Sequence, residues 1–466
     1  MMPTIRSMKA VHSRLINSKL FLLAGIDTAM IYTYSAKAIG MVCSPLTMWF
    51  ILTFLSKEEM GFYYVIISLL GSSMLRDMGF SNILMLFASH EKSNLSWDSS
   101  NKLVGDPTSL RRLNGMMRLG MQWFGLGTVI FTIVMIPLGL YFLNKEPNAG
   151  NIAFATPWIL SVLVISIAGL LAPITSIFEG CNRVKELRFL GIIQPLLAYP
   201  LQWSLLLTGC GLFAYGGFQL GGIIVSIAWF ISRQRQFLKT ILLEKEEQIH
   251  FEPKEMWPLL WRTLIGSAGG YMTISLFNPM AFAYLGSVEA GKLGASFALC
   301  AFISTLSIPF IGNQIPAIGG LWASKDYKQL NRLFMQCMTR LLFVSLFWAA
   351  MTWLLAYSLK IYLPHYGDRF VRLHQLPLML LATVFMNLIM AQSFFVRANK
   401  QDPLVWASLT MGLLIAFSNW LLIRHFGLTG MLSGYLSITA TMFVVYVSIT
   451  RFNVMKWQRE SAKITA

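Results

Sequence analysis

Long apolar runs follow one another along the chain, separated by short polar stretches. Each run has about 20 residues or more, the length that a helix needs to cross roughly 30 Å of hydrocarbon. The apolar residues are continuous and do not alternate with period two, so the pattern predicts helices and not barrel strands. We count twelve predicted spans, at residues 33–56, 62–88, 115–143, 154–178, 188–211, 214–241, 258–285, 292–322, 333–363, 376–396, 403–423 and 428–450.

The composition supports an all-α polytopic membrane protein. Hydrophobic residues make up 56% of the chain, charged residues make up 12%, and the mean hydropathy is +0.60. A soluble domain carries about twice that proportion of charge. The basic N-terminal segment lacks a signal-peptide pattern, so we expect the first span to remain in the protein.

The net charge is +17, and the distribution of its Lys and Arg residues indicates how the chain is oriented in the membrane. With the N-terminus inside the cell, cytoplasmic segments and helix ends hold 28 Lys and Arg residues, whereas the outer loops hold seven. This asymmetry follows the positive-inside rule and predicts that both termini are cytoplasmic. It also accounts for the positive charge without a nucleic-acid partner. The five cysteines are scattered, so we expect neither a disulfide framework nor a metal site.

Short stretches of the first half return in the second half, in the same order. FLSKEEMG, starting at Phe54, matches YLGSVEAG, starting at Tyr284, and LFASHE, starting at Leu86, matches LWASKD, starting at Leu321. RRLN with KQLN and CNRVKEL with ANKQDPL give two further matches. These matches predict two six-span repeats. Because six is even, both repeats enter the membrane from the same side and are related by an axis along its normal.

The repeats divide the chain into two predicted lobes. Residues 1–243 form the N-lobe, residues 244–255 form a polar cytoplasmic linker, and residues 256–466 form the C-lobe. Two equivalent bundles that meet on such an axis are the plan of transporters that work by alternating access, with a central cavity between the lobes.

Four stretches in the first quarter of the chain resemble the polysaccharide-exporter (Wzx-like) branch of the MATE/MOP flippase superfamily. They are GIDTAMIYTYSAKAIG, FLSKEEMGFYY, DMGFSNILMLFASHE and WDSSNKLVGDPTSLRRL. The resemblance is dense over residues 23–125 and elsewhere concerns mainly the helix count. This chain departs from the branch at Arg76-Asp77, where relatives usually carry an apolar residue before the carboxylate.

The resemblance implies a flippase that moves an undecaprenyl-diphosphate-linked oligosaccharide from the cytoplasmic to the outer leaflet. It further implies the bacterial inner membrane as the location and polysaccharide-assembly proteins as partners. No cofactor is implied. Such a cargo needs cations for its diphosphate, hydrogen-bonding groups for its sugars, and an exit for its lipid.

The first two spans contain the cations that we expect to hold the diphosphate. At 1.5 Å per residue, Lys37 lies about 25 Å and Arg76 about 22 Å from the outer turn that joins these spans. We expect the Arg76 guanidinium to bind the diphosphate through two hydrogen bonds and the Lys37 ammonium to bind it as a single charge. Asp77 would set the geometry of these cations or accept a coupling proton. Snorkelling of Lys37 to the cytoplasmic interface and neutralisation of Arg76 by Asp77 are the structural alternatives. Arg262 is the expected cation of the second lobe.

Amide side chains within the spans are the expected contacts of the saccharide. Amides in lipid-buried helices need partners, which are either other helices or cargo hydroxyls. The expected contacts are Gln194, Asn278, Asn313, Gln314 and Asn387.

Two other classes of function stay open on the sequence. A small-molecule or multidrug exporter of the same superfamily would be expected to keep cavity carboxylates without cations beside them. A membrane saccharide polymerase or ligase would need a large outer loop, and the longest one here is LPHYGDRFVRLHQ. GSVEAGK resembles a phosphate-binding loop, but Leu293 stands where that loop needs Ser or Thr, and no strand precedes it.

Overall fold

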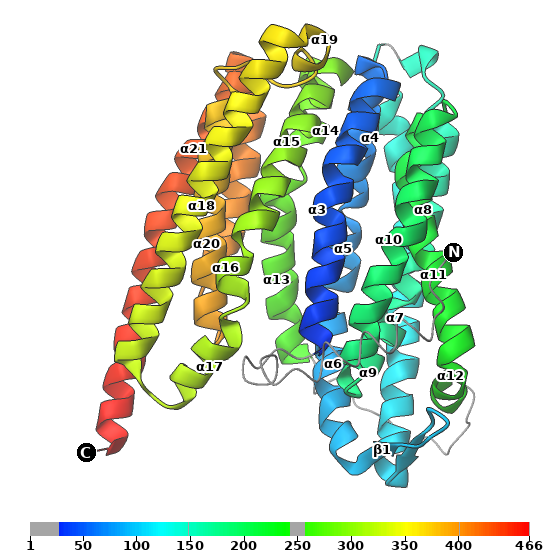
Figure 1. Ribbon diagram of the computed structural model, residues 1–466, viewed down its shortest axis with the longest axis vertical. Coiled ribbons are helices and arrows are strands. Elements are labelled where there is room, and N and C mark those ends of the chain that lie inside the picture. The colour runs from blue at the N-terminus through cyan, green and yellow to red at the C-terminus, as the bar shows by residue number, and fades with distance from the viewer. Residues whose placement is uncertain (1–27, 148, 243–256, 400, 466) are drawn as a thin grey trace, which may run out of the picture.

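The computed structural model describes residues 28–147, 149–242, 257–399 and 401–465, and nearly all of them are helical. The first half contains α3 to α12 and the second half α13 to α21 (Figure 1). The N-lobe helices are α3 (Thr28–Phe54), α4 (Lys57–Leu70), α5 (Ser73–Asp77), α6 (Phe80–Glu91), α7 (Pro107–Leu143), α8 (Ala155–Leu170), α9 (Ala172–Gly180), α10 (Val184–Leu207), α11 (Ala214–Arg233) and α12 (Arg235–Leu242). The C-lobe helices are α13 (Trp257–Ile274), α14 (Phe277–Leu285), α15 (Ser287–Ser307), α16 (Pro309–Gly312), α17 (Ile315–Ala323), α18 (Tyr327–Tyr362), α19 (Pro364–Gly367), α20 (Leu376–Arg397) and α21 (Val405–Thr465).

All twelve predicted spans are present, although several of them are divided into shorter helices and two are fused. Nine described helical segments are individually long and apolar enough to cross a membrane. Two further spans are broken into pieces, span 2 into α4, α5 and α6, and span 7 into α13 and α14. Spans 11 and 12 run together in α21, which kinks at Gly427, where φ is 58°. The expected fold class is therefore confirmed, whereas the linker at 244–255 lies outside the described residues.

Several predicted boundaries were wrong because capping residues extend the helices beyond the apolar run. The sequence predicted that span 3 begins at 115 and span 9 at 333, whereas α7 begins at Pro107 and α18 at Tyr327. In each case an aspartate caps the first turn. The Asp106 side chain accepts a hydrogen bond from the Ser109 amide at 2.9 Å, and Asp326 accepts one from Gln329 at 3.0 Å.

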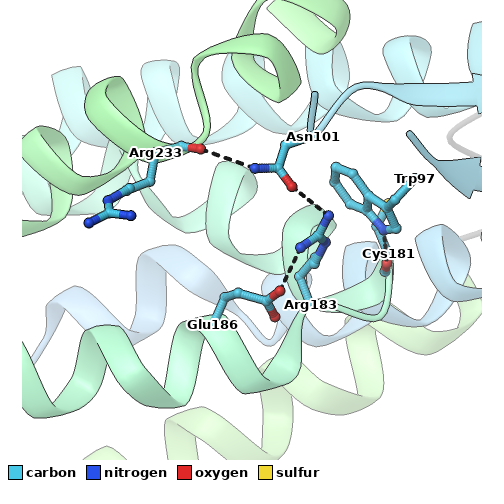
Figure 2. Close-up of polar contacts among 6 residues, drawn as sticks. All are labelled: Trp97, Asn101, Cys181, Arg183, Glu186 and Arg233. Atoms are coloured by element: carbon cyan, nitrogen blue, oxygen red, sulfur yellow. Dashed lines mark hydrogen bonds and ion pairs between the residues drawn. The ribbon is translucent and has the colours of Figure 1, made fainter. Parts of the chain in front are cut away.

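The loop between spans 2 and 3 contains a small hairpin that the all-α prediction missed. Strand β1 (Leu95–Trp97) pairs antiparallel with β2 (Leu103–Gly105). The hairpin docks on the turn between α9 and α10 (Figure 2). Trp97 donates from Nε1 to the Cys181 carbonyl at 2.9 Å, and the Arg183 guanidinium lies 4.1 Å from the centre of the Trp97 ring. Arg183 also bonds Asn101 at the hairpin tip and Glu186 in α10, at 2.8 and 2.6 Å. The hairpin therefore ties together one end of the N-lobe.

The two lobes touch mainly at one end of the molecule. Helices α14 and α15 pack on α4 near α19, which we call the α19 end, and α13 packs on α5 and α6. The hairpin marks the opposite end, called here the hairpin end. Figure 1 shows the ribbons of the two lobes close together at the α19 end and further apart at the hairpin end.

Candidate functional site

The break in span 2 lies beside the charged pair that the sequence singled out. Met78 and Gly79 both adopt left-handed backbone conformations, with φ of 49° and 75°. Asp77 bridges the break, since its Oδ1 accepts hydrogen bonds from the Ser81 amide at 2.9 Å and the Ser81 hydroxyl at 2.8 Å. A Cβ on Gly79 would lie 2.8 Å from the Thr263 Cβ, so the break packs closely on α13 of the other lobe. Asp77 thus holds the start of α6.

Arg76 points into the N-lobe, where its guanidinium lies between α7 and α8. It donates to the Ile165 carbonyl at 3.2 Å and to the Thr128 hydroxyl at 3.4 Å. It also lies over the Phe131 ring, 5.3 Å from the ring centre. A Cβ on Gly169 would overlap the guanidinium, so this glycine provides the space that the cation occupies. In this conformation Arg76 joins two helices of its own lobe.

Lys37 has a different environment. It lies on α3, its side chain is exposed, and α3 packs chiefly along α10. In the described part of the chain, no ion pair or hydrogen bond joins Lys37, Arg76 and Asp77. Arg76 is thus engaged with α7 and α8, and a role for Lys37 or Arg76 in diphosphate binding stays a prediction. Arg262 lies in α13, and its side chain is outside the described part of the structure.

Three of the five predicted saccharide contacts are engaged with serines of neighbouring helices. Gln194 bonds Ser226 at 2.7 Å, Asn278 bonds Ser68 at 2.9 Å, and Asn387 bonds Ser345 at 3.2 Å. The Asn278 bond crosses between the lobes, and Asn387 is 1% exposed. Asn313 and Gln314 lie at the break between α16 and α17, where Asn313 is exposed. The three bonded amides thus join neighbouring helices in this conformation, and saccharide contact by any of the five stays a prediction.

Tyrosines that the sequence did not single out line a cavity of about 250 Å³ in the N-lobe, which we call the tyrosine pocket. It lies among α3, α4, α10 and α11, and one residue of α15 reaches its wall. The lining consists of Ser44, Thr47, Met48, Ile51, Tyr63, Tyr64, Ile67, Tyr199, Gln202, Tyr215, Phe218 and Ala298. None of these side chains is a carboxylate or a cation. The pocket therefore offers aromatic rings, hydroxyls and an amide, but no charge.

Hydrogen bonds hold the polar groups of the tyrosine pocket in place. Gln202 donates from Nε2 to the Tyr63 hydroxyl at 3.0 Å, and both residues are buried. Trp203, next to the pocket, donates to the Thr47 hydroxyl at 2.9 Å. The Tyr199 and Phe218 rings pack edge to face, with centres 5.1 Å apart. The walls are thus ordered before any ligand enters, as expected of a binding pocket.

A second cavity of about 330 Å³ shares the lining residue Phe218 with the tyrosine pocket. It lies among α8, α9, α10 and α11, and its polar lining includes Gln194, Gln219, Thr175 and Ser226. Like the tyrosine pocket, it has no charged lining residue. Among the described residues, no group of three or more His, Cys, Asp or Glu side chains is placed to hold a metal ion.

Twelve spans in two lobes that meet on a shared seam make up the fold of this chain. No protein-family model and no curated protein matches the chain. Among solved structures, the lipid II flippase MurJ in an inward closed conformation superposes with a TM-score of 0.65 at 15% identity, over 92% of this chain and 88% of that one.

Two multidrug-resistance MATE family transporters of the MOP superfamily also have a similar fold. An inward-facing conformation gives a TM-score of 0.57 at 12% identity, covering 89% of this chain and 99% of that chain. An outward-facing one gives 0.58 at 13% identity, covering 95% and 99%. At these identities the likeness establishes the fold and not the cargo, and it does not distinguish the Wzx-like branch from the rest of the superfamily.

Proposed function

We propose that the protein is a flippase that moves a lipid-linked, diphosphate-bearing oligosaccharide between membrane leaflets by alternating access. The observation that carries the proposal is the charge pattern of the N-lobe spans. They combine the exposed cation Lys37, the half-buried cation Arg76 and two pockets without charged lining residues. The nearby carboxylate, Asp77, is engaged with Ser81. This pattern suits an anionic headgroup with an uncharged sugar.

The tyrosine pocket supports the saccharide part of the proposal. A pyranose ring has an apolar face that packs on aromatic rings, and its hydroxyls bond amide and hydroxyl groups. Tyr63, Tyr199, Gln202 and Thr47 supply these groups within one pocket. The volume of about 250 Å³ suits a single sugar ring and not a whole oligosaccharide.

The proposed orientation follows from the charge distribution along the sequence. If both termini are cytoplasmic, the basic hairpin end faces the cytoplasm and the α19 end faces outward. The lobes are then joined on the outer side and diverge on the cytoplasmic side, as expected before cargo is loaded from the cytoplasm. Cargo would enter past Lys37, the lobes would rock, and the lipid would stay outside the protein.

A small-molecule exporter is the second candidate, and the tyrosine pocket favours it too, because aromatic walls also accept flat organic molecules. The shortage of carboxylates in the spans argues against a cationic substrate. The polymerase or ligase is less well supported, since the described loops at the α19 end are short, such as residues 363–375 between α18 and α20.

The deciding experiment measures lipid-linked saccharides in a deletion strain of the native host. We expect them to accumulate in the cytoplasmic leaflet and to be cleared by the intact gene. The informative variant is Lys37→Ala, because this side chain is exposed and its loss leaves packing intact. Arg340→Ala, which removes an exposed cation from α18, is the matched control. Sensitivity to drugs without accumulation would favour the exporter, and outward-facing single repeat units would favour the polymerase.

A further inference from the structure

The two copies of the repeated turn meet each other on the seam between the lobes. FLSKEEMG and YLGSVEAG align at an offset that pairs Gly61 with Gly291 and Lys57 with Ser287. A Cβ on Gly61 would overlap the Ser287 carbonyl, and a Cβ on Gly291 would lie 3.1 Å from the Lys57 carbonyl and 2.9 Å from the Gly61 amide nitrogen. Gly61 therefore packs against Ser287, and Gly291 packs against Lys57, which is the residue that aligns with Ser287. Such reciprocity is the signature of a local two-fold axis.

Glu146 crosses this seam from the N-lobe. It lies in the loop between α7 and α8, and it is 8% exposed. Its Oε1 accepts a hydrogen bond from the Ser287 amide at 3.0 Å and from the Ser287 hydroxyl at 2.9 Å. Ser287 begins α15, so the carboxylate of one lobe caps a helix of the other. A negative charge at a helix N-terminus is stabilised by the free amides and the helix dipole.

Arg369 crosses the seam in the opposite direction. It lies in the loop between α18 and α20, and it is 5% exposed. Its Nη1 donates to the Leu55 carbonyl, just beyond the C-terminal end of α3 in the N-lobe. A cation near the C-terminus of a helix is favoured by the carbonyl groups that the last turn leaves free. Nearby, the Thr53 and Tyr366 hydroxyls also meet across the lobes, 3.4 Å apart.

The two crossings are equivalent in position and opposite in charge. Each comes from the loop that follows the third span of its repeat, and each reaches the turn between the first two spans of the other repeat. Glu146 binds amide groups at the start of one helix, and Arg369 binds a carbonyl at the end of another. In each crossing, a side chain of one lobe bonds the backbone of the other lobe, so separation of the lobes at the α19 end breaks both crossings.

We propose that Glu146 and Arg369 are reciprocal latches that hold the lobes closed at the α19 end and must release when the protein opens there. The proposal concerns the conformational equilibrium and does not depend on the identity of the cargo. Neither residue needs to touch the cargo, so both are positioning residues.

The test measures access to the seam from the α19 side. Ser68 lies on α4, deeper than Gly61 by seven residues or about 10 Å, and it faces Asn278 of the other lobe. Ser68→Cys in a background without the five native cysteines provides one reporter thiol. Cells are treated with a membrane-impermeant maleimide, and the labelling rate is measured.

Glu146→Ala and Arg369→Ala are each expected to raise the labelling rate roughly tenfold, because each removes a buried charge-assisted hydrogen bond from the closed state alone. The matched controls are Lys145→Ala and Arg372→Ala, which remove exposed cations from the same loops. Glu146→Met and Arg369→Met keep most of the side-chain volume but cannot make the hydrogen bond, and they serve where an alanine variant fails to fold.

Labelling of the folded latch variants within twofold of their controls would overturn the proposal. An increase in both would support it, and an increase in one alone would overturn the reciprocal pairing. The measurement needs no cargo. The latch therefore stands or falls independently of the lipid-linked saccharide, which the accumulation experiment tests.

Discussion

Replacing Gly61 by alanine should force the lobes apart at the α19 end. The added Cβ would overlap the Ser287 carbonyl oxygen and would lie 2.6 Å from its carbon and 2.9 Å from its Cα. Ordinary contacts between such atoms are about 3.5 to 4.0 Å, so the two helices must separate by about 1 Å. All three atoms belong to the backbone of the first turn of α15, and no side-chain rotation can relieve the overlap.

The expected magnitude follows from the cost of overpacking. Extra methyl groups in a close-packed interface cost about 1 to 3 kcal/mol. This cost falls on the closed state alone, whereas the gain in helix propensity at Gly61 is shared by both states and cancels. The ratio of closed to open protein should therefore fall roughly 5- to 150-fold, at 1.4 kcal/mol for each factor of ten.

The assay is again labelling of Ser68→Cys, now across a graded series of glycine replacements. At Gly291 the nearest atom, the Gly61 amide nitrogen, is 2.9 Å from the added Cβ, so Gly291→Ala should have a smaller effect than Gly61→Ala. At Gly125 in α7 nothing lies within 4 Å of the added Cβ, and Gly125→Ala is the control. An equal labelling rate in all three variants, with the folded state intact, would refute the reasoning.

Three further predictions test the topology and the N-lobe. Cys210 is exposed just beyond the α19 end of α10 and should react with an impermeant maleimide added outside cells, and labelling of Cys210 only in inverted vesicles would reverse the proposed orientation. In detergent, where the reagent reaches both ends, Cys210 should be labelled and Cys181 should stay unlabelled at pH 7 to 9, because burial raises the pKa of the Cys181 thiol to about 12 and leaves little thiolate. Trp97→Ala should destabilise the N-lobe by about 2 kcal/mol through lost packing and the lost Arg183 cation–π contact, seen as a lower Tm in detergent. An unchanged Tm would contradict the inference that the hairpin ties together one end of the N-lobe. Arg76→Ala should lower the Tm more than Arg76→Met, which keeps most of the volume between α7 and α8, and equal losses would indicate that charge outweighs packing there.

The number and order of the helices could be predicted from the sequence, whereas their interruptions could not. A span shows in the sequence because about 20 apolar residues are needed to cross hydrocarbon. The break after Asp77 depends on a left-handed conformation at Met78, which is uncommon for a residue with a side chain. It is stabilised by the Ser81 bonds and the close approach to Thr263, neither of which a hydropathy pattern reports.

The direction in which a charged side chain points also could not be predicted from the sequence. Counting residues predicts a depth for Lys37, because the rise per residue of a helix is constant, whereas the count for Arg76 crosses the break between α4 and α5. The face that each side chain occupies depends on helix rotation and on the break in span 2. Arg76 lies against Gly169 of α8, some 90 residues later in the chain, and only tertiary packing brings them together. The tyrosine pocket was missed for the same reason, since Tyr63 and Tyr199 come from different spans.

The repeated turn acquires a physical role once both copies are placed on the seam. A duplicated segment beside a two-fold axis must pack against its own copy, and glycine at the crossing lets two backbones approach most closely. Because Gly61 and Gly291 are both needed for this approach, a change in either copy should affect the same closed state. Glu146 and Arg369 cannot be the same residue type, because Glu146 accepts from an amide group and Arg369 donates to a carbonyl group. Their positions are equivalent, and their opposite charges follow from the opposite helix ends that they bind. Gly61 and Gly291 are identical residues at matching positions, so a comparison of the two repeats finds them. Glu146 and Arg369 occupy equivalent places in the fold but are different residue types, so the same comparison misses them.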